Sequence, residues 1–152
     1  MNLISSYCNS ILNALGSMSK DVNLVLAHES GIKHVPVGKP YAAIGIKKCS
    51  VSSPIVQKNE DGADITDGTR KILITASINI YAPYKNGGLS CVKIYENIFD
   101  HIFNSSILGF VETKFLGTKY SRETQSIVAE TEFVFECFLS DSEFIEPIVP
   151  GE

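Results

Sequence analysis

The amino-acid sequence predicts an α+β fold: an antiparallel sheet with two helices packed on one face, in the order α-β-β-β-α-β-β, with a long flap between the early strands. Two segments repeat apolar residues at three- and four-residue steps, the period of an amphipathic helix. Five others alternate apolar and polar residues or are short and rich in branched side chains, as strands are. Hairpins combined with two helices are typical of helices layered on one face of an antiparallel sheet. The other sheet face is then left to solvent or to a partner.

Length and composition predict one domain. The chain has 152 residues, of which 44% are hydrophobic and 20% charged, which is enough to close one core. We expect a single domain over residues 1–140 and a C-terminal tail over residues 141–152, where two prolines and three glutamates favour a surface position. The sequence has no run of about 18 apolar residues, and no Lys or Arg precedes Lys20. We therefore expect neither a membrane span nor a signal peptide, and a cytoplasmic origin.

The charge balance argues against direct nucleic-acid binding. The net charge is −4 at pH 7, and the 13 Lys and Arg residues are spread along the chain. Proteins that bind phosphates cluster their basic residues on one surface. We expect no specific contact with nucleic acid.

The first half of the chain is predicted to hold one helix and three strands. The helix carries apolar residues from Ile4 to Leu15 on one side and ends before Gly16. The third strand has isoleucines at every second position from Ile72 to Ile80, interrupted by Ala76. In order, the expected elements are a helix at 2–15, a strand at 23–28, a loop at 29–40, a strand at 41–51, a mobile arm or flap at 52–69 and a strand at 70–81.

The second half is predicted to add the principal core helix and a final strand pair. The helix, residues 89–106, has a broad apolar stripe of three aromatic and three aliphatic side chains besides Cys91. Burying this stripe stabilises the fold by roughly 10 kcal/mol. The final strands are expected at 110–120 and 126–139, joined by a polar turn. The last strand alternates well, with Phe133 and Phe135 on one side and Glu130, Glu132 and Glu136 on the other.

Candidates for chemistry are few. His28, His34 and His101 form no spacing that places two ligands on one helix face. Four cysteines are too far apart for a CxxC-type zinc site, and we interpret them as core residues, with a disulfide as the remote alternative: Cys8, Cys49, Cys91 and Cys137. The acidic flap lacks the closing Glu of a calcium loop, and the YKNGG turn lacks a phosphate-binding motif. We predict no enzyme activity, no cofactor and no metal.

The glutamate row on the last strand allows three interpretations. Successive glutamates on one strand face lie about 6.5 to 7 Å apart and repel unless they are screened. The first interpretation is a solvated face balanced by lysines of neighbouring strands, where Lys71 and Lys114 can meet Glu130 or Glu132. The second is a catalytic carboxylate pair. The third is a surface that faces a channel or another subunit.

The sequence resembles a known family in its element order. The short N-terminal helix, the strand ending in INIYAPYKNGG, the helix LSCVKIYENIFDHIF and the closing strand pair are similar to those of the tail-terminator and tail-completion proteins of tailed bacteriophages and phage-derived particles. That family implies a small α+β structural protein without catalytic residues. It also implies a homo-oligomeric ring, commonly hexameric, that caps the head-proximal end of the tail tube, with a mobile loop that contacts a neighbouring subunit or the tube.

This resemblance implies partners, location and surfaces. The expected partners are further copies of the chain, a tail tube protein and a neck or connector protein, with DNA passing through the ring unbound, in a particle assembled in the bacterial host cytoplasm. The glutamates Glu130, Glu132 and Glu136 are expected to face the channel or a subunit. The expected interface comprises Leu73, Tyr81, Val128, Val134, Phe138 and the flap residues Asp61, Asp64 and Asp67. Alternatives are a neck or connector adaptor of the same particle, or a small enzyme whose site lies around His28, His34 and the flap.

Overall fold

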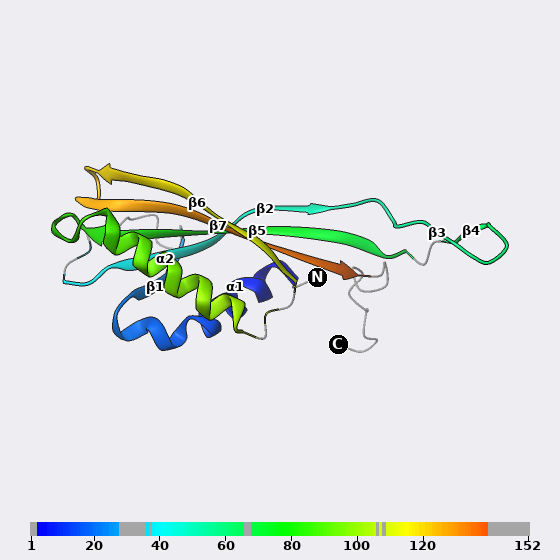
Figure 1. Cartoon of the computed structure of the whole chain (residues 1–152), viewed down its shortest axis with the longest axis horizontal. Helices are drawn as coiled ribbons and strands as arrows, with labels where there is room; N and C mark the ends of the chain where they lie inside the picture. Colours follow the sequence, from blue (N-terminus) through cyan, green and yellow to red (C-terminus); the bar gives the residue numbers. More distant parts are fainter. Residues whose placement is uncertain are drawn as a thin grey trace, which may run out of the picture.

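The computed structural model describes residues 3–27, 36, 38–65, 68–105, 107 and 109–139. Among them it shows an α+β fold with a five-stranded sheet and two α-helices (Figure 1). In chain order the elements are α1 (Leu3–Ala14), the 3₁₀ turn η1 (Gly16–Lys20), β1 (Asn23–Leu26), β2 (Tyr41–Val51), β3 (Gln57–Lys58), β4 (Asp64–Ile65), β5 (Arg70–Pro83), η2 (Tyr84–Asn86), α2 (Gly88–Phe103), β6 (Phe110–Ser121) and β7 (Ser126–Leu139).

The sheet is mixed, which corrects the expectation of a purely antiparallel one. Its strand order is β1-β2-β5-β7-β6. Strands β2, β5, β7 and β6 pair antiparallel, but β1 runs parallel to β2, with Asn23 opposite Tyr41. Residues 27–40 separate the two strands, and a parallel neighbour needs a connection of about a dozen residues or more. The long loop between them was therefore already compatible with a parallel pair.

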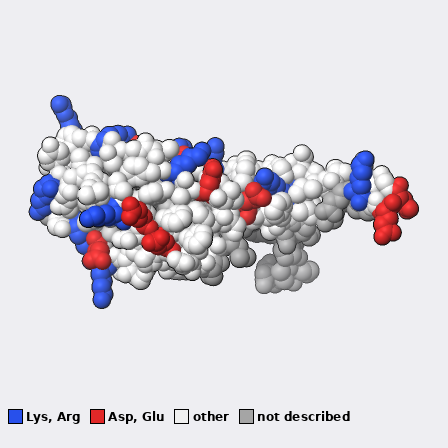
Figure 2. Space-filling model, viewed as in Figure 1, with Lys and Arg blue, Asp and Glu red and all other residues white. Residues whose placement is uncertain are grey.

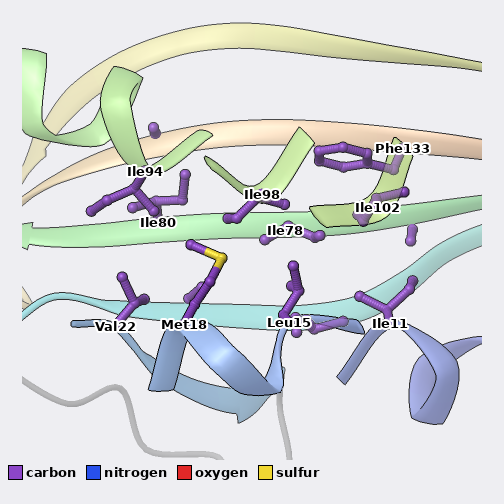
Figure 3. Packing of buried hydrophobic residues seen from close by; sticks show 14 of the residues in the cluster. Ile11, Leu15, Met18, Val22, Ile78, Ile80, Ile94, Ile98, Ile102 and Phe133 are labelled. Carbon is purple, nitrogen blue, oxygen red and sulfur yellow. The ribbon is translucent and has the colours of Figure 1, made fainter. Parts of the chain in front are cut away.

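Both helices pack on the same face of the sheet and close one hydrophobic core (Figure 3). In α2 the buried side chains recur at helical spacing, and on β5 every second residue from Ile72 to Ala82 is fully buried. Phe133 and Phe135 of β7 are fully buried as well. Removing each such large side chain from water stabilises the fold by about 1.5–3 kcal/mol before entropy is counted. Around Ile78 and Ile80 the core gathers Ile11, Leu15, Met18, Val22, Ile94, Ile98, Ile102 and Phe133.

In the described residues the expected flap is a hairpin arm (Figure 1). Strands β2 and β5 run out past the helices, and the small hairpin β3–β4 prolongs them away from the body. Backbone hydrogen bonds connect the two sides of the arm. The N–H of Ser52 donates to the carbonyl of Lys71, and the N–H of Ile55 donates to the carbonyl of Thr69. At the tip, the side-chain oxygen of Asn59 accepts the backbone N–H groups of Asp61 and Ala63 at 3.0 and 2.9 Å. Such a turn provides hydrogen-bond acceptors for backbone N–H groups at the tip of the arm.

Gly109 fixes where β6 begins. Its φ is +81°, and a Cβ there would lie 1.9 Å from the carbonyl oxygen of Glu136. Its own carbonyl accepts the backbone N–H of Glu136 at 2.7 Å. Only glycine allows this approach, so the chain leaving α2 is brought directly against β7.

None of the described helices is both long and apolar enough to cross a bilayer. The predicted tail over residues 141–152 lies outside the described residues.

Candidate functional site

The sheet surface opposite the two helices is the first candidate, and we call it the outer face. It is formed by alternate residues from 71 to 81 on β5 and from 128 to 138 on β7, with their neighbours on β2 and β6. This is the side of β7 for which the sequence predicted a row of glutamates. The structure confirms that Glu130, Glu132 and Glu136 lie on the side of β7 away from the core residues Phe133 and Phe135.

Each of the three glutamates has a lysine partner. Glu132 pairs with Lys47 of β2 at 2.6 Å, Glu136 with Lys71 of β5 at 3.4 Å, and Glu130 with Lys119 of β6 at 2.6 Å. The partners expected from the sequence were Lys71 and Lys114, so Lys71 pairs with a different glutamate than expected and Lys114 lies 3.6 Å from Glu112. In the described residues, lysines of β2, β5 and β6 match the three glutamates, as the first of the three interpretations expects.

Lys47 reaches Glu132 across the intervening strand β5. Alternation along β2 places Lys47 on the same face as Gly45, and the register between β2 and β5 shifts between Ile46 and Lys48, so that Lys48 lies opposite Thr75 on this face as well. On β5 between them lies Ser77, opposite Gly45 on one side and Glu132 on the other. Gly45 and Ser77 are small, and together with Lys47 and Glu132 they line a depression of about 520 Å³.

The lysine partner changes the chemistry of the carboxylate. The hydrogen bond from Lys47 lowers the pKa of Glu132, outweighing the partial burial that raises it, and the charges of Lys47, Lys114 and Lys48 lower it further. A general acid needs a raised pKa, near the working pH. Glu132 is therefore placed to stay ionised as half of an ion pair.

The predicted interface residues on the outer face divide into buried and exposed ones. Tyr81 and Val128 are buried in a second small cluster, where Tyr81 stacks on Tyr41 with ring centroids 4.5 Å apart. Leu73 and Val134 are half-buried, and Phe138 is 54% exposed. Phe138 thus offers contact area to a partner, whereas Tyr81 and Val128 are used within the chain.

The arm holds the described part of the predicted acidic flap. Asp61 is exposed at the tip, and Asp64 lies in β4. Asp67 lies outside the described residues. Val51 and Val56 expose 46% and 59% of their surface along the arm, so its surface carries apolar side chains as well as charges. Figure 2 shows both charge signs at the far end of the arm.

The strongest arrangement for catalysis among the described residues is a hydrogen-bonded serine and histidine. His101 Nε2 lies 2.9 Å from Ser17 Oγ, and its Nδ1 lies 2.7 Å from the carbonyl of Asn97. Nearby is a depression of about 660 Å³, lined by Asp100, Asn104 and residues of α1. The contact between Ser17 and His101 joins η1 to α2. A catalytic role for Ser17 as a nucleophile would also require hydrogen-bond donors that stabilise the oxyanion of the reaction intermediate. His28 and His34 lie outside the described residues.

The cysteines and acidic groups add little chemistry. All four cysteines are free thiols, with Cys91 buried and the others half-buried. Burial raises the pKa of Cys8, Cys91 and Cys137, which lowers the fraction of reactive thiolate. No three His, Cys, Asp or Glu side chains in the described part of the chain are grouped so that they could hold a metal ion.

The sequence predicted strand β6 but not that it is an edge strand with exposed apolar side chains. Four of its apolar side chains are exposed: Val111, Phe115, Leu116 and Tyr120. Register shifts between Phe110 and Glu112 and between Phe115 and Gly117 break its alternation. The signal was present in FVETKFLGTKYS, where apolar residues lie side by side instead of at every second position.

Two comparisons with known proteins found no relative. No protein-family model matches the chain, and no curated protein matches it significantly.

Proposed function

We propose that the chain is a structural protein of a phage tail or phage-like particle. It forms a homo-oligomeric ring, of six copies as is common for such proteins, that caps the head-proximal end of the tail tube and joins it to the neck. In this proposal the protein assembles in the bacterial host cytoplasm and catalyses no reaction. It follows from the resemblance in element order, and the arm is the observation that carries it.

The arm supports self-association because it projects away from the core. It is a hairpin prolonged past the helices, with Val51 and Val56 exposed on it. A projecting hairpin gains nothing from the monomer's core, whereas on a neighbouring subunit it buries those side chains. A contact from the arm of one copy to the body of the next is heterologous. Repeating it closes a ring when the rotation from one copy to the next divides a full turn into equal steps.

The outer face supports passage of DNA without binding. Its glutamates are matched by Lys47, Lys71 and Lys119, so it offers no concentrated positive charge to hold phosphates. The whole chain is net negative. A surface of this kind lining a channel would let DNA pass, although the paired glutamates repel phosphates less than a bare acidic row would.

An arm-truncated variant tests the ring. Replacing residues 54–68 by a short turn removes β3 and β4 but leaves the body and its core. We expect the full chain to give rings in negative-stain images and a matching mass in native mass spectrometry, and the variant to fold without forming rings. The control is Glu96→Gln on the exposed side of α2, which should keep them. Rings formed by the truncated variant, or none formed by the full chain at any concentration, would contradict the proposal.

A charge swap tests the role of the glutamate row. The double variant Lys47→Glu with Glu132→Lys keeps the ion pair and the net charge but reverses the position of each sign. Rings should persist if the pair serves the fold alone, whereas a direct contact with a neighbouring subunit predicts that ring assembly weakens. Imaging the ring on isolated tail tubes then distinguishes a tube cap from a neck adaptor by its position.

A further inference from the structure

Strand β6 is the long free edge of the sheet. It spans 12 residues and pairs with β7 alone, and no other described strand lies along its outer side. The opposite edge, β1, is only 4 residues long. Natural sheets keep edge strands short or cover them, because the free N–H and C=O groups recruit another chain. Among the described residues this edge is uncovered, so it can recruit a further strand.

Exposed apolar side chains concentrate at this edge. Seven of the eleven large apolar residues exposed in the described part of the chain lie on β6 or on η2 and α2 beside it. Tyr84 contacts Tyr120, and Phe99 contacts both Phe103 and Phe110, so the helix and the strand form one continuous surface. A contiguous apolar area of this kind marks an interaction site.

We propose that the partner is a second copy of this chain, whose β6 pairs antiparallel with this one about a two-fold axis. The register that sets residues 112–114 of one copy against residues 117–119 of the other brings Phe115 and Leu116 next to the two-fold axis. Phe115 lies there on the helix side, where its ring contacts Tyr95, and Leu116 lies on the outer side, where it lines the depression beside Glu130 and Glu132. Glu112 then lies opposite Lys119, and by symmetry this pair occurs twice.

The two bulges agree with this register. In the ladder with β7 the unpaired residues are Val111 and Leu116, and the segments 112–115 and 117–121 are regular. The register sets residues 112–114 against residues 117–119 of the other copy, so regular backbone meets regular backbone. Within these segments Glu112 lies opposite Val134 and Lys119 opposite Val128 across the ladder, so both point to the outer face and can meet.

Charge complementarity favours this occupant over others. Opposite charges directly across an antiparallel pair stabilise it, and like charges destabilise it. Sliding one copy by two residues in one direction sets Lys114 opposite Lys119, and in the other direction it sets Glu112 opposite Gly117 and removes the opposite-charge pair. The register with Glu112 opposite Lys119 is therefore the favourable one of the three. In the isolated chain Lys119 already pairs with Glu130 at 2.6 Å and Glu112 lies 3.6 Å from Lys114, and the dimer extends these pairs into a network across the axis.

The first test uses Leu116→Lys. Leu116 is 50% exposed, so the variant should fold, but it places two lysines at the two-fold axis. On the full chain, sedimentation velocity from about 1 to 100 μM should show a concentration-dependent association step, in which two of the species present join through β6, and the variant should lose this step. The matched control is Leu26→Lys on β1, at the opposite sheet edge and outside the arm, where the side chain is 36% exposed, and it should dimerise as the wild type does. A wild type without dimer, or a Leu116→Lys dimer of unchanged strength, overturns the proposal.

The second test checks the register by mixing two variants. Glu112→Lys alone faces Lys119 of its copy, and Lys119→Glu alone faces Glu112, so each should dimerise about tenfold or more weakly than the wild type. Mixed together, they restore both opposite-charge pairs, and the heterodimer should form. Recovery in the mixture also shows that both variants are folded. Equal dimerisation of the variants apart and mixed contradicts this register.

This inference does not rest on the proposed ring. The β6 contact is two-fold and uses the sheet edge, whereas the ring contact is heterologous and uses the arm. The arm-truncated variant should therefore lose rings and keep the dimer, and Leu116→Lys should lose the dimer and keep rings. A variant that loses both assemblies together would contradict the separation of the two contacts.

Discussion

The two faces of β7 show how differently one strand can be stabilised. On the core side, Phe133 and Phe135 are fully buried beneath α2. One residue away on the outer side, Glu132 and Glu136 form ion pairs with lysines of other strands. Burial of a large side chain contributes several-fold more than a partly exposed ion pair. The core face therefore supplies most of the stability, and the outer face is free to vary its chemistry.

The largest expected effect is the contrast between adjacent residues on opposite faces. Phe133→Ala should lower the free energy of unfolding by about 3–5 kcal/mol, because it removes a fully buried ring and leaves a cavity. Val134→Ala, on the half-buried outer face, should cost about 1 kcal/mol. Urea denaturation of both variants measures the difference. Equal losses would mean that the core face and the outer face of β7 contribute equally to the free energy of unfolding.

The second prediction concerns the apolar part of the outer face. Tyr41 and Tyr81 stack with an interplanar angle of 14°, and such aromatic pairs gain about 0.5–1.5 kcal/mol beyond their buried area. A double-mutant cycle with Tyr41→Ala and Tyr81→Ala should give a coupling free energy in that range. A coupling near zero would show that the two rings are placed by the strands and do not stabilise each other.

The third prediction concerns the ion pairs. A cycle between Lys47→Ala and Glu132→Ala should give a coupling of about 0.2–1 kcal/mol, because the Lys47 side chain is 52% exposed and solvent screens the pair. Added salt should reduce the coupling. The same cycle on Lys71 and Glu136, which lie 3.4 Å apart, should give a smaller value. A Lys47–Glu132 coupling free energy larger than that of Tyr41 and Tyr81 would contradict the expectation that the ion pair contributes less than the aromatic pair.

The smallest effect is a pH dependence with a defined sign. Because the hydrogen bond from Lys47 lowers the pKa of Glu132, folding favours the ionised carboxylate, and this stability is present above the ordinary Glu pKa. It is lost as pH falls from the ordinary Glu pKa through the lowered one. Glu132→Gln should therefore destabilise the protein at neutral pH and have little effect in acid, as measured by thermal melts.

The control for this pH effect is the background that lacks the lysine. In Lys47→Met, Glu132→Gln should have a smaller pH-dependent effect, because the hydrogen bond that chiefly lowers the pKa of Glu132 is gone. An unchanged pH dependence in that background would assign it to the charges of Lys48 and Lys114 instead.

Most of the α+β fold was predictable because its signals are local. The period of α2, the isoleucines of β5 and the alternation of β7 each follow from which side of one element is apolar. The glutamate row was predictable for the same reason, since neighbours at every second position share a face. The existence of the arm followed from the turn-rich segment between two strong strands.

The partners of these elements depended on tertiary structure. Nothing local sets β1 parallel to β2, because strand direction depends on the path of a distant connection. Lys47 reaches Glu132 because β5, which lies between β2 and β7, carries the small residue Ser77 at this level. Tyr81 is buried because β2 brings Tyr41 onto it.

By itself, then, the sequence determined the elements, their buried sides and the row of carboxylates. The tertiary structure alone decided which lysine meets each carboxylate, which apolar residues of the outer face are used within the chain, and that β6 is left as the long free edge. The physical reason is that periodicity acts between residues a few positions apart, whereas strand order and register place together residues as distant as Lys47 and Glu132.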